Sequence, residues 1–217
     1  MANKPLIPEN PERGWGQILP PYFKAGVRLE NHAMNGRSSK SFRDEGRWQM
    51  VLDSLKPGDW VIIQFGHNDE KDKDASRFTT PFGSFKTNLL QYISEARAHQ
   101  ANPILATPTA RRKFDESGKL VDTHGDYVKA VRAVAAEQGV PLIDLNLRSD
   151  ELLRREGPEL SKKNYIWVTK DEYPALPKGR EDDTHFCAFG ASRMCDLAVD
   201  EIKTNIPELA RFLNMAK

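Results

Sequence analysis

The sequence has no long hydrophobic run and almost no net charge. Its 217 residues include 32 Lys and Arg against 31 Asp and Glu, a formal net charge of +1 at pH 7. No stretch approaches the roughly 20 consecutive apolar residues that a membrane span needs. The opening, MANKPLIPENPERGWG, has no apolar core typical of an export signal. The balanced charge gives no electrostatic reason to expect binding to nucleic acid or to an anionic membrane. We therefore expect a globular protein with no membrane span and no nucleic-acid partner.

Cysteine is also scarce. Cys187 and Cys195 are the two cysteines of the chain. If both lie along a helix that begins near Gly190, they are about 12 Å apart, too far for a disulfide bond. Two cysteines without the spacing of a metal motif also exclude a cysteine zinc site. We expect two free thiols.

The patterns of apolar residues predict an α/β fold. Apolar or alternating runs predict strands over residues 27–31, 60–66, 103–108 and 141–146. Apolar stripes at helical spacing predict helices around residues 48–55, 85–96, 128–138 and 194–202. Alternating strands and helices imply βαβ crossovers and a parallel sheet covered on both faces.

The chain has no repeat or linker that would divide it, so residues 1–217 are expected to form a single domain. Residues 110–125 have a Ser-Gly turn between short arms and predict a hairpin. Residues 161–182 are aromatic, charged and interrupted by proline, which predicts a long surface loop.

Three segments carry residues suited to catalysis. The first, FGHND, ends the strongest predicted strand. In an open α/β sheet, ligands bind beyond the carboxyl ends of the strands. The side-chain amide of Asn68 can there stabilise a developing oxyanion. The alternative is a turn in which Asn68 or Asp69 caps the next segment.

The second segment, NHAMNGRSSKSF, follows the predicted strand 27–31. Gly36 has no Cβ, so its backbone N–H can approach a ligand closely and donate to an oxyanion. The alternative is structural, because Asn-Gly favours a tight turn and Ser38 or Ser39 can cap a following helix.

The third segment is DDTHF, just before the last predicted helix. His185 has Asp182 three residues earlier. This spacing suits a general base whose tautomer and orientation are held by a carboxylate. The alternative is that Asp183 or Thr184 caps the helix and that His185 is a surface residue.

Taken together and in this order, the three segments resemble blocks two, three and five of the SGNH (GDSL-type) hydrolase superfamily. The stretch Asn31 to Phe42 is similar to its rhamnogalacturonan acetylesterase-like branch position by position, and the resemblance extends from Trp15 to Phe189. It implies a three-layer flavodoxin-like fold and serine esterase chemistry without a metal or organic cofactor. The expected substrate is an acetylated polysaccharide or oligosaccharide of the pectic, rhamnogalacturonan type.

Carried over residue by residue, the resemblance implies that Gly36 and Asn68 are oxyanion-hole donors. Asp182 is then the orienting acid and His185 the general base. Arg111 and Arg112, just past a predicted strand, can meet uronate carboxylates, although such arginines are more often surface charges.

The nucleophile block of the family is absent from the sequence. Gly58-Asp59 is followed by Trp60, and no Gly-Asp-Ser occurs anywhere. The opening of the chain resembles what normally follows that block. We therefore expect Met1 to be an internal methionine of a longer protein whose central first strand and nucleophilic serine lie upstream, and we expect no activity from residues 1–217 alone. The alternative nucleophiles are Ser38, Ser39 and Ser41, close to Gly36.

Two other functions stay open from the sequence. One is a carbohydrate-binding remnant that keeps the crevice and has lost the nucleophile. The other is a metal-dependent hydrolase that uses His67, Asp69, Asp182 and His185. An esterase acting on a polysaccharide is usually exported, but the sequence does not assign a compartment or an oligomeric state.

Overall fold

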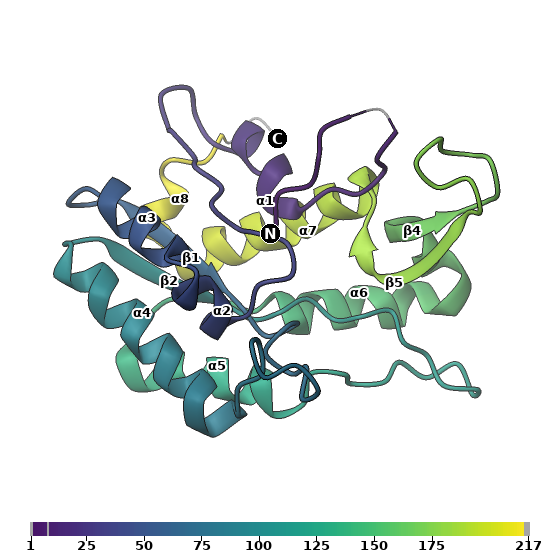
Figure 1. The fold of residues 1–217 in the computed structure, drawn as a ribbon. Helices are drawn as coiled ribbons and strands as arrows, with labels where there is room; N and C mark the ends of the chain where they lie inside the picture. The colour runs from purple at the N-terminus through teal and green to yellow at the C-terminus, as the bar shows by residue number, and fades with distance from the viewer. Residues whose placement is uncertain (1, 8, 215–217) are drawn as a thin grey trace.

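The computed structural model describes residues 2–7 and 9–214 and has a three-stranded parallel sheet at its centre (Figure 1). The strands are β1 (Trp60–Gln64), β2 (Asn102–Ala106) and β3 (Leu142–Ile143), in the order β1-β2-β3. β2 pairs with β1 along its whole length and with β3 at its carboxyl end. The α/β fold with a parallel sheet, predicted from the sequence, is confirmed.

Helices lie on both faces of this sheet, with α4 and α5 on one face and α7 on the other (Figure 1). The helices are α1 (Trp15–Ile18), α2 (Ser39–Asp44), α3 (Arg47–Ser54), α4 (Lys86–Ala98), α5 (Asp126–Gln138), α6 (Leu145–Leu160), α7 (Ala188–Asn205) and α8 (Pro207–Ala210). Shorter helical turns are η1 (Pro20–Tyr22), η2 (Pro81–Phe85) and η3 (Ser161–Asn164). Within the described ranges, no helix is long and apolar enough to cross a bilayer.

The hydrophobic core has two parts, one on each face of the sheet. Side chains of a strand alternate between its faces, so neighbouring residues enter different parts. Ile104 and Ala106 of β2 pack into the cluster that includes α1, α6 and α7, whereas Leu105 packs into the cluster of α3, α4 and α5. This double burial explains why β1 and β2 are continuous apolar runs.

Two expectations about secondary structure were wrong. Residues 27–31 form no strand, because no described strand pairs with them and they line a large cavity instead. Residues 145–160 form α6, for which the sequence analysis predicted no helix. The predicted strand ends after Ile143. The side chain of Asp144 then accepts a hydrogen bond from the N–H of Leu147 and so caps α6.

The segment 161–182 was expected to be a long loop, but much of it is regular. β4 (Tyr165–Val168) and β5 (Arg180–Phe186) form an antiparallel pair beside the main sheet. The rings of Tyr165 and Phe186 lie 5.0 Å apart and fix the base of this β4–β5 hairpin in the core. The predicted turn in 110–125 does form a minimal hairpin, with an antiparallel bridge between Phe114 and Leu120.

The start of α7 comes very close to η3, the turn that directly precedes β4. A Cβ on Gly190 would lie 1.8 Å from the backbone oxygen of Asn164, so only glycine allows this approach. Cys187 precedes α7 and Cys195 lies inside it, and both are free thiols, as predicted. α7 therefore packs against the turn that leads into β4, and β4 pairs with β5, which carries Asp182 and His185.

Candidate active site

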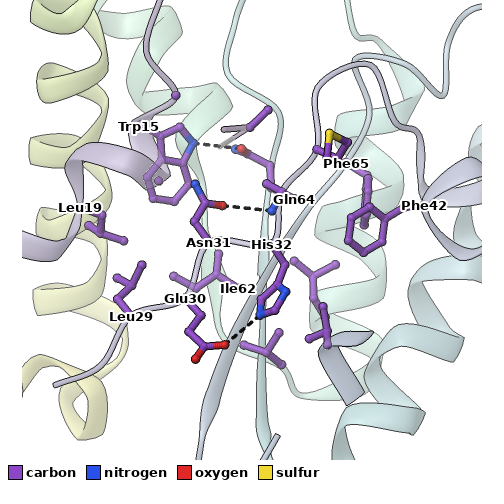
Figure 2. Close-up of a pocket in the computed structure, with 18 of the residues that line it drawn as sticks. Trp15, Leu19, Leu29, Glu30, Asn31, His32, Phe42, Ile62, Gln64 and Phe65 are labelled. Carbon is purple, nitrogen blue, oxygen red and sulfur yellow. Dashed lines mark hydrogen bonds and ion pairs between the residues drawn. The ribbon is translucent and has the colours of Figure 1, made fainter. Parts of the chain in front are cut away.

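A cavity of about 1190 Å³ opens beside β1, which lies at the edge of the described sheet. Its walls come from segments that are far apart in the sequence. Figure 2 shows apolar and polar side chains facing each other across it: Trp15, Leu19 and Leu29 on one side, Phe42 and Phe65 on the other, and Ile62 and Gln64 of β1 between them. The indole Nε1 of Trp15 donates to Oε1 of Gln64 at 3.0 Å and thereby ties α1 to β1.

Asp182 and His185 lie together on β5 in the wall of this cavity. Nδ1 of His185 is 2.8 Å from Oδ2 of Asp182. The other carboxylate oxygen accepts hydrogen bonds from the backbone N–H groups of Thr184, at 2.8 Å, and His185, at 2.9 Å. The carboxylate thus holds both the imidazole and the backbone that carries it.

The charge of Asp182 is stabilised by these contacts. Burial on its own raises the pKa of Asp182, but the hydrogen bonds from His185 and Thr184 hold it well below its ordinary value. An ionised Asp182 favours a proton on Nδ1 of His185, which leaves the lone pair on Nε2. The side chain of His185 is 37% exposed, and the residue lines the cavity.

Arg180 is a site residue that the sequence analysis did not single out. Its guanidinium pairs with Asp182 and Glu12, and Glu12 in turn accepts from Nζ of Lys4 at 2.7 Å. The one arginine beside three acids in Arg-Glu-Asp-Asp was the available signal, but the sequence does not tell which acid the arginine meets. The network connects β5 to the amino-terminal segment.

Gly36 and Asn68 line the same cavity from a second wall, near the carboxyl end of β1. Gly36 has φ of 77°, the left-handed region that favours glycine. Among the described residues its N–H donates to no protein acceptor. Nδ2 of Asn68 donates to the backbone oxygen of Arg37 at 3.2 Å, which leaves its second N–H hydrogen for a ligand.

The four residues that the resemblance implied, Gly36, Asn68, Asp182 and His185, therefore line one cavity although they come from three segments. Two backbone or amide donors and one carboxylate-oriented imidazole is the set of groups that acyl transfer needs besides a nucleophile.

The two arginines expected to face a uronate differ in position. Arg112 is buried and pairs with Asp183 at 2.6 Å, and its guanidinium lies 4.8 Å from the ring centre of Trp167. It therefore holds the β4–β5 hairpin and does not face the crevice. Arg111 lines the cavity, where it pairs with Glu70.

Ser38, Ser39 and Ser41 are buried and already hydrogen-bonded. Ser38 and Ser41 cap α2 reciprocally, and Oγ of Ser39 donates to Asp69 at 2.5 Å. No serine in the described ranges hydrogen-bonds to His185. None of the three alternative nucleophiles is therefore placed to give its proton to the base.

The groups proposed for a metal site do not converge. Across residues 2–7 and 9–214, no three His, Cys, Asp or Glu side chains are arranged to hold an ion. Asp69 is buried beneath Ser39, and the ring of His67 packs edge-on against His124, with centroids 4.6 Å apart. Desolvation, with the nearby His124 and Arg111, keeps the pKa of His67 well below its ordinary value.

These features define the chain as a hydrolase-type α/β domain, and it belongs to the GDSL-like lipase/acylhydrolase family, whose profile matches residues 4–166. The chain is 40% identical to rhamnogalacturonan acetylesterase RhgT of Bacillus subtilis (strain 168) over 195 residues, 90% of this chain and 82% of that protein. It is 28% identical to the rhamnogalacturonan acetylesterase of Emericella nidulans, over 84% of this chain and 76% of that protein.

Solved structures give the same fold. The crystal structure of protein YxiM from Bacillus subtilis superposes with a TM-score of 0.73 and 30% identity, over 89% of this chain and 51% of that one, so the chain spans about half of its length. The acetylxylan esterase Axe2 of Geobacillus stearothermophilus superposes with a TM-score of 0.59 at 20% identity, over 87% of this chain and 77% of that one. The likeness to Axe2 supports the fold alone.

Proposed function

We propose that this chain carries the base and the oxyanion donors of a serine esterase that removes acetyl groups from a pectic, rhamnogalacturonan-type glycan. The observation that carries the proposal is the convergence of Gly36, Asn68 and the Asp182–His185 pair on one cavity. Similarity to two rhamnogalacturonan acetylesterases supports the choice of substrate class.

The chemistry follows from the positions of these groups. A serine Oγ attacks the acetyl carbonyl while Nε2 of His185 takes its proton, and Asp182 stabilises the imidazolium. The N–H of Gly36 and the amide of Asn68 bind the oxyanion. The C–O bond to the sugar breaks and His185 returns the proton to the sugar oxygen. Water then attacks the acyl-enzyme, with His185 again as base, and acetate leaves.

We place the nucleophilic serine on a segment outside residues 1–217. The cavity runs along the edge of β1 and is lined by Leu29 and Ile62, which suits an apolar strand pairing with β1. A serine at the carboxyl end of such a strand, running parallel to β1, would lie at the edge of the sheet where Asn68 follows β1. On this proposal residues 1–217 alone have the base without its nucleophile.

The first test is covalent labelling. We would incubate chain 1–217 with a fluorophosphonate and measure its intact mass, in parallel with a serine-bearing form, in which an apolar strand ending in Gly-Asp-Ser precedes residue 1. We expect no adduct on chain 1–217 and one stoichiometric adduct on the serine-bearing form. His185→Ala in the serine-bearing form should abolish labelling, whereas His99→Ala, at an exposed histidine after α4, should not.

Other results would change the proposal in defined ways. An adduct on chain 1–217 would show an activated serine within it, and peptide mapping would identify that serine. No adduct on either form would reject esterase function and favour a carbohydrate-binding protein. Acetate release from acetylated rhamnogalacturonan, compared with acetylated xylan, then tests the substrate class.

A further inference from the structure

Asp69 is the most enclosed charged group beneath the oxyanion donors. Its side chain is 0% exposed and lies one residue beyond Asn68. Buried carboxylates are costly unless they accept several hydrogen bonds. The burial of this carboxylate in a loop beside the crevice therefore needs a physical explanation.

The carboxylate of Asp69 accepts hydrogen bonds from two different loops. Oδ1 accepts from the N–H of Ser39 at 3.0 Å and from its hydroxyl at 2.5 Å. Oδ2 accepts from the N–H of Gly66 at 3.1 Å. Oγ1 of Thr79 donates to Oδ1 at 3.0 Å. Ser39 begins α2, three residues after Gly36, whereas Gly66 and Asp69 enclose Asn68.

Helices from the core hold the same two loops. From α4, the hydroxyl of Tyr92 donates to the backbone oxygen of Ser39 at 2.8 Å, and Nδ2 of Asn88 donates to its Oγ at 3.0 Å. From α5, the hydroxyl of Tyr127 lies within hydrogen-bond distance of the backbone oxygens of Asp69, at 3.1 Å, and of Thr79, and its single hydrogen is shared between them. Both sides of the carboxylate bridge are therefore fixed to the rigid part of the fold.

Gly66, two residues before Asn68, restricts the path of the loop that carries Asn68. Gly66 has φ of 137°, and a Cβ there would lie 2.8 Å from Cγ of Pro108. The loop that carries Asn68 is thus confined on one side by Pro108 and tied on the other through Asp69. An alternative path for this loop would break the bond from the Gly66 N–H.

We propose that Asp69 is a positioning residue that bridges the Gly36 loop and the Asn68 loop and sets the separation of the two oxyanion donors. The role rests on the proposed esterase function, because it matters only if these donors bind an oxyanion. Oxyanion stabilisation depends on donors that are already in place before charge develops. One carboxylate that reaches both loops provides this constraint.

The test compares Asp69→Asn with Asp72→Asn, a matched change at an exposed carboxylate of the same loop. Heteronuclear NMR spectra of ¹⁵N-labelled chain 1–217 report the backbone amide of Gly36 and the side-chain amide of Asn68. We expect D69N to move both resonances well beyond their linewidths and D72N to leave both unchanged. If D69N moves only Ser39, Gly66 and Thr79, the proposal is overturned.

A second variant covers the case in which D69N does not fold. Thr79→Val keeps the shape of the side chain and removes one donor to Asp69, outside the crevice. It should move the Gly36 and Asn68 resonances in the same direction as D69N, by a smaller amount. A folded T79V with both resonances at their wild-type positions would contradict the bridge.

Kinetics separate positioning from a general loss of structure. In the serine-bearing form, D69N should lower kcat by about 100-fold, the order of one lost oxyanion donor, with KM within about threefold of wild type. Equal loss of substrate binding and turnover would contradict the role. If the serine-bearing form does not react, the proposed function fails, and the NMR comparison still decides whether Asp69 couples the two loops.

Discussion

The two walls of the crevice are built in different ways. The wall with Gly36 and Asn68 stands on the fully buried carboxylate of Asp69, whereas the wall with Asp182 and His185 belongs to the β4–β5 hairpin beside the main sheet. The side chain of Asp69 is 0% exposed and that of His185 is 37% exposed. Oxyanion donors act by being fixed in advance, whereas a base must exchange protons with a nucleophile, a sugar oxygen and water. The difference in burial fits the two tasks that we propose for these walls.

The largest expected effect lies on the hairpin wall. In the serine-bearing form, His185→Ala should lower kcat for acetate release by about 10⁴-fold or more, because no other group can take the proton of the serine. Initial rates over a range of substrate concentrations measure this. A loss below about tenfold would mean that His185 is not the base.

The next effect tests the opposite wall. Asn68→Ala removes one side-chain donor and should lower kcat by about 10²- to 10³-fold with little change in KM. The same assay measures it. If N68A raised KM and left kcat unchanged, Asn68 would bind the ground state of the substrate and would not stabilise an oxyanion.

A stability measurement tests how the hairpin wall is attached. Arg112→Met removes the ion-pair partner of Asp183, whose carboxylate keeps only the hydrogen bond from Nε1 of Trp167. We expect the free energy of unfolding to fall by about 3 kcal/mol, at the low end for a broken buried pair, because Asp183 remains partly hydrated. Arg154→Met, in an exposed pair with Asp150, should cost less than about 0.5 kcal/mol. Urea denaturation of both variants decides, and equal losses would contradict the role of Arg112.

The smallest effect concerns the pH dependence of the wall with Asp69. Burial raises the pKa of Asp69 from 3.8 to about 6 in the folded state. The stabilisation from this group is therefore fully present below pH 3.8 and is lost as pH rises through about 6. Between pH 4 and pH 8, wild type should lose roughly 2–3 kcal/mol of unfolding free energy relative to D69N. Urea denaturation across this range measures the difference, and parallel curves would contradict the shift.

Much of the fold was predictable from local pattern. The continuous apolar runs that became β1 and β2 report burial on both faces, and helical stripes located α3, α4, α5 and α7. Residues 27–31 alternate like a strand, but a strand exists only where another strand pairs with it. The β4–β5 hairpin was missed because its many charged residues are untypical of a strand, and the ion pair of Arg180 with Glu12 joins segments that lie far apart in the sequence.

The sequence by itself determined the elements of the central sheet. It also determined the local geometry of Asp182 and His185, because the two residues are three positions apart on one segment, close enough for the carboxylate to meet the imidazole. Only the tertiary structure decided which acid does which task. Asp183 turns to Arg112, and Asp69, which the sequence presents as a turn or metal residue, joins two loops 30 residues apart through Ser39. The physical reason is that a buried carboxylate takes its role from the donors that folding brings to it, and those donors come from elsewhere in the chain.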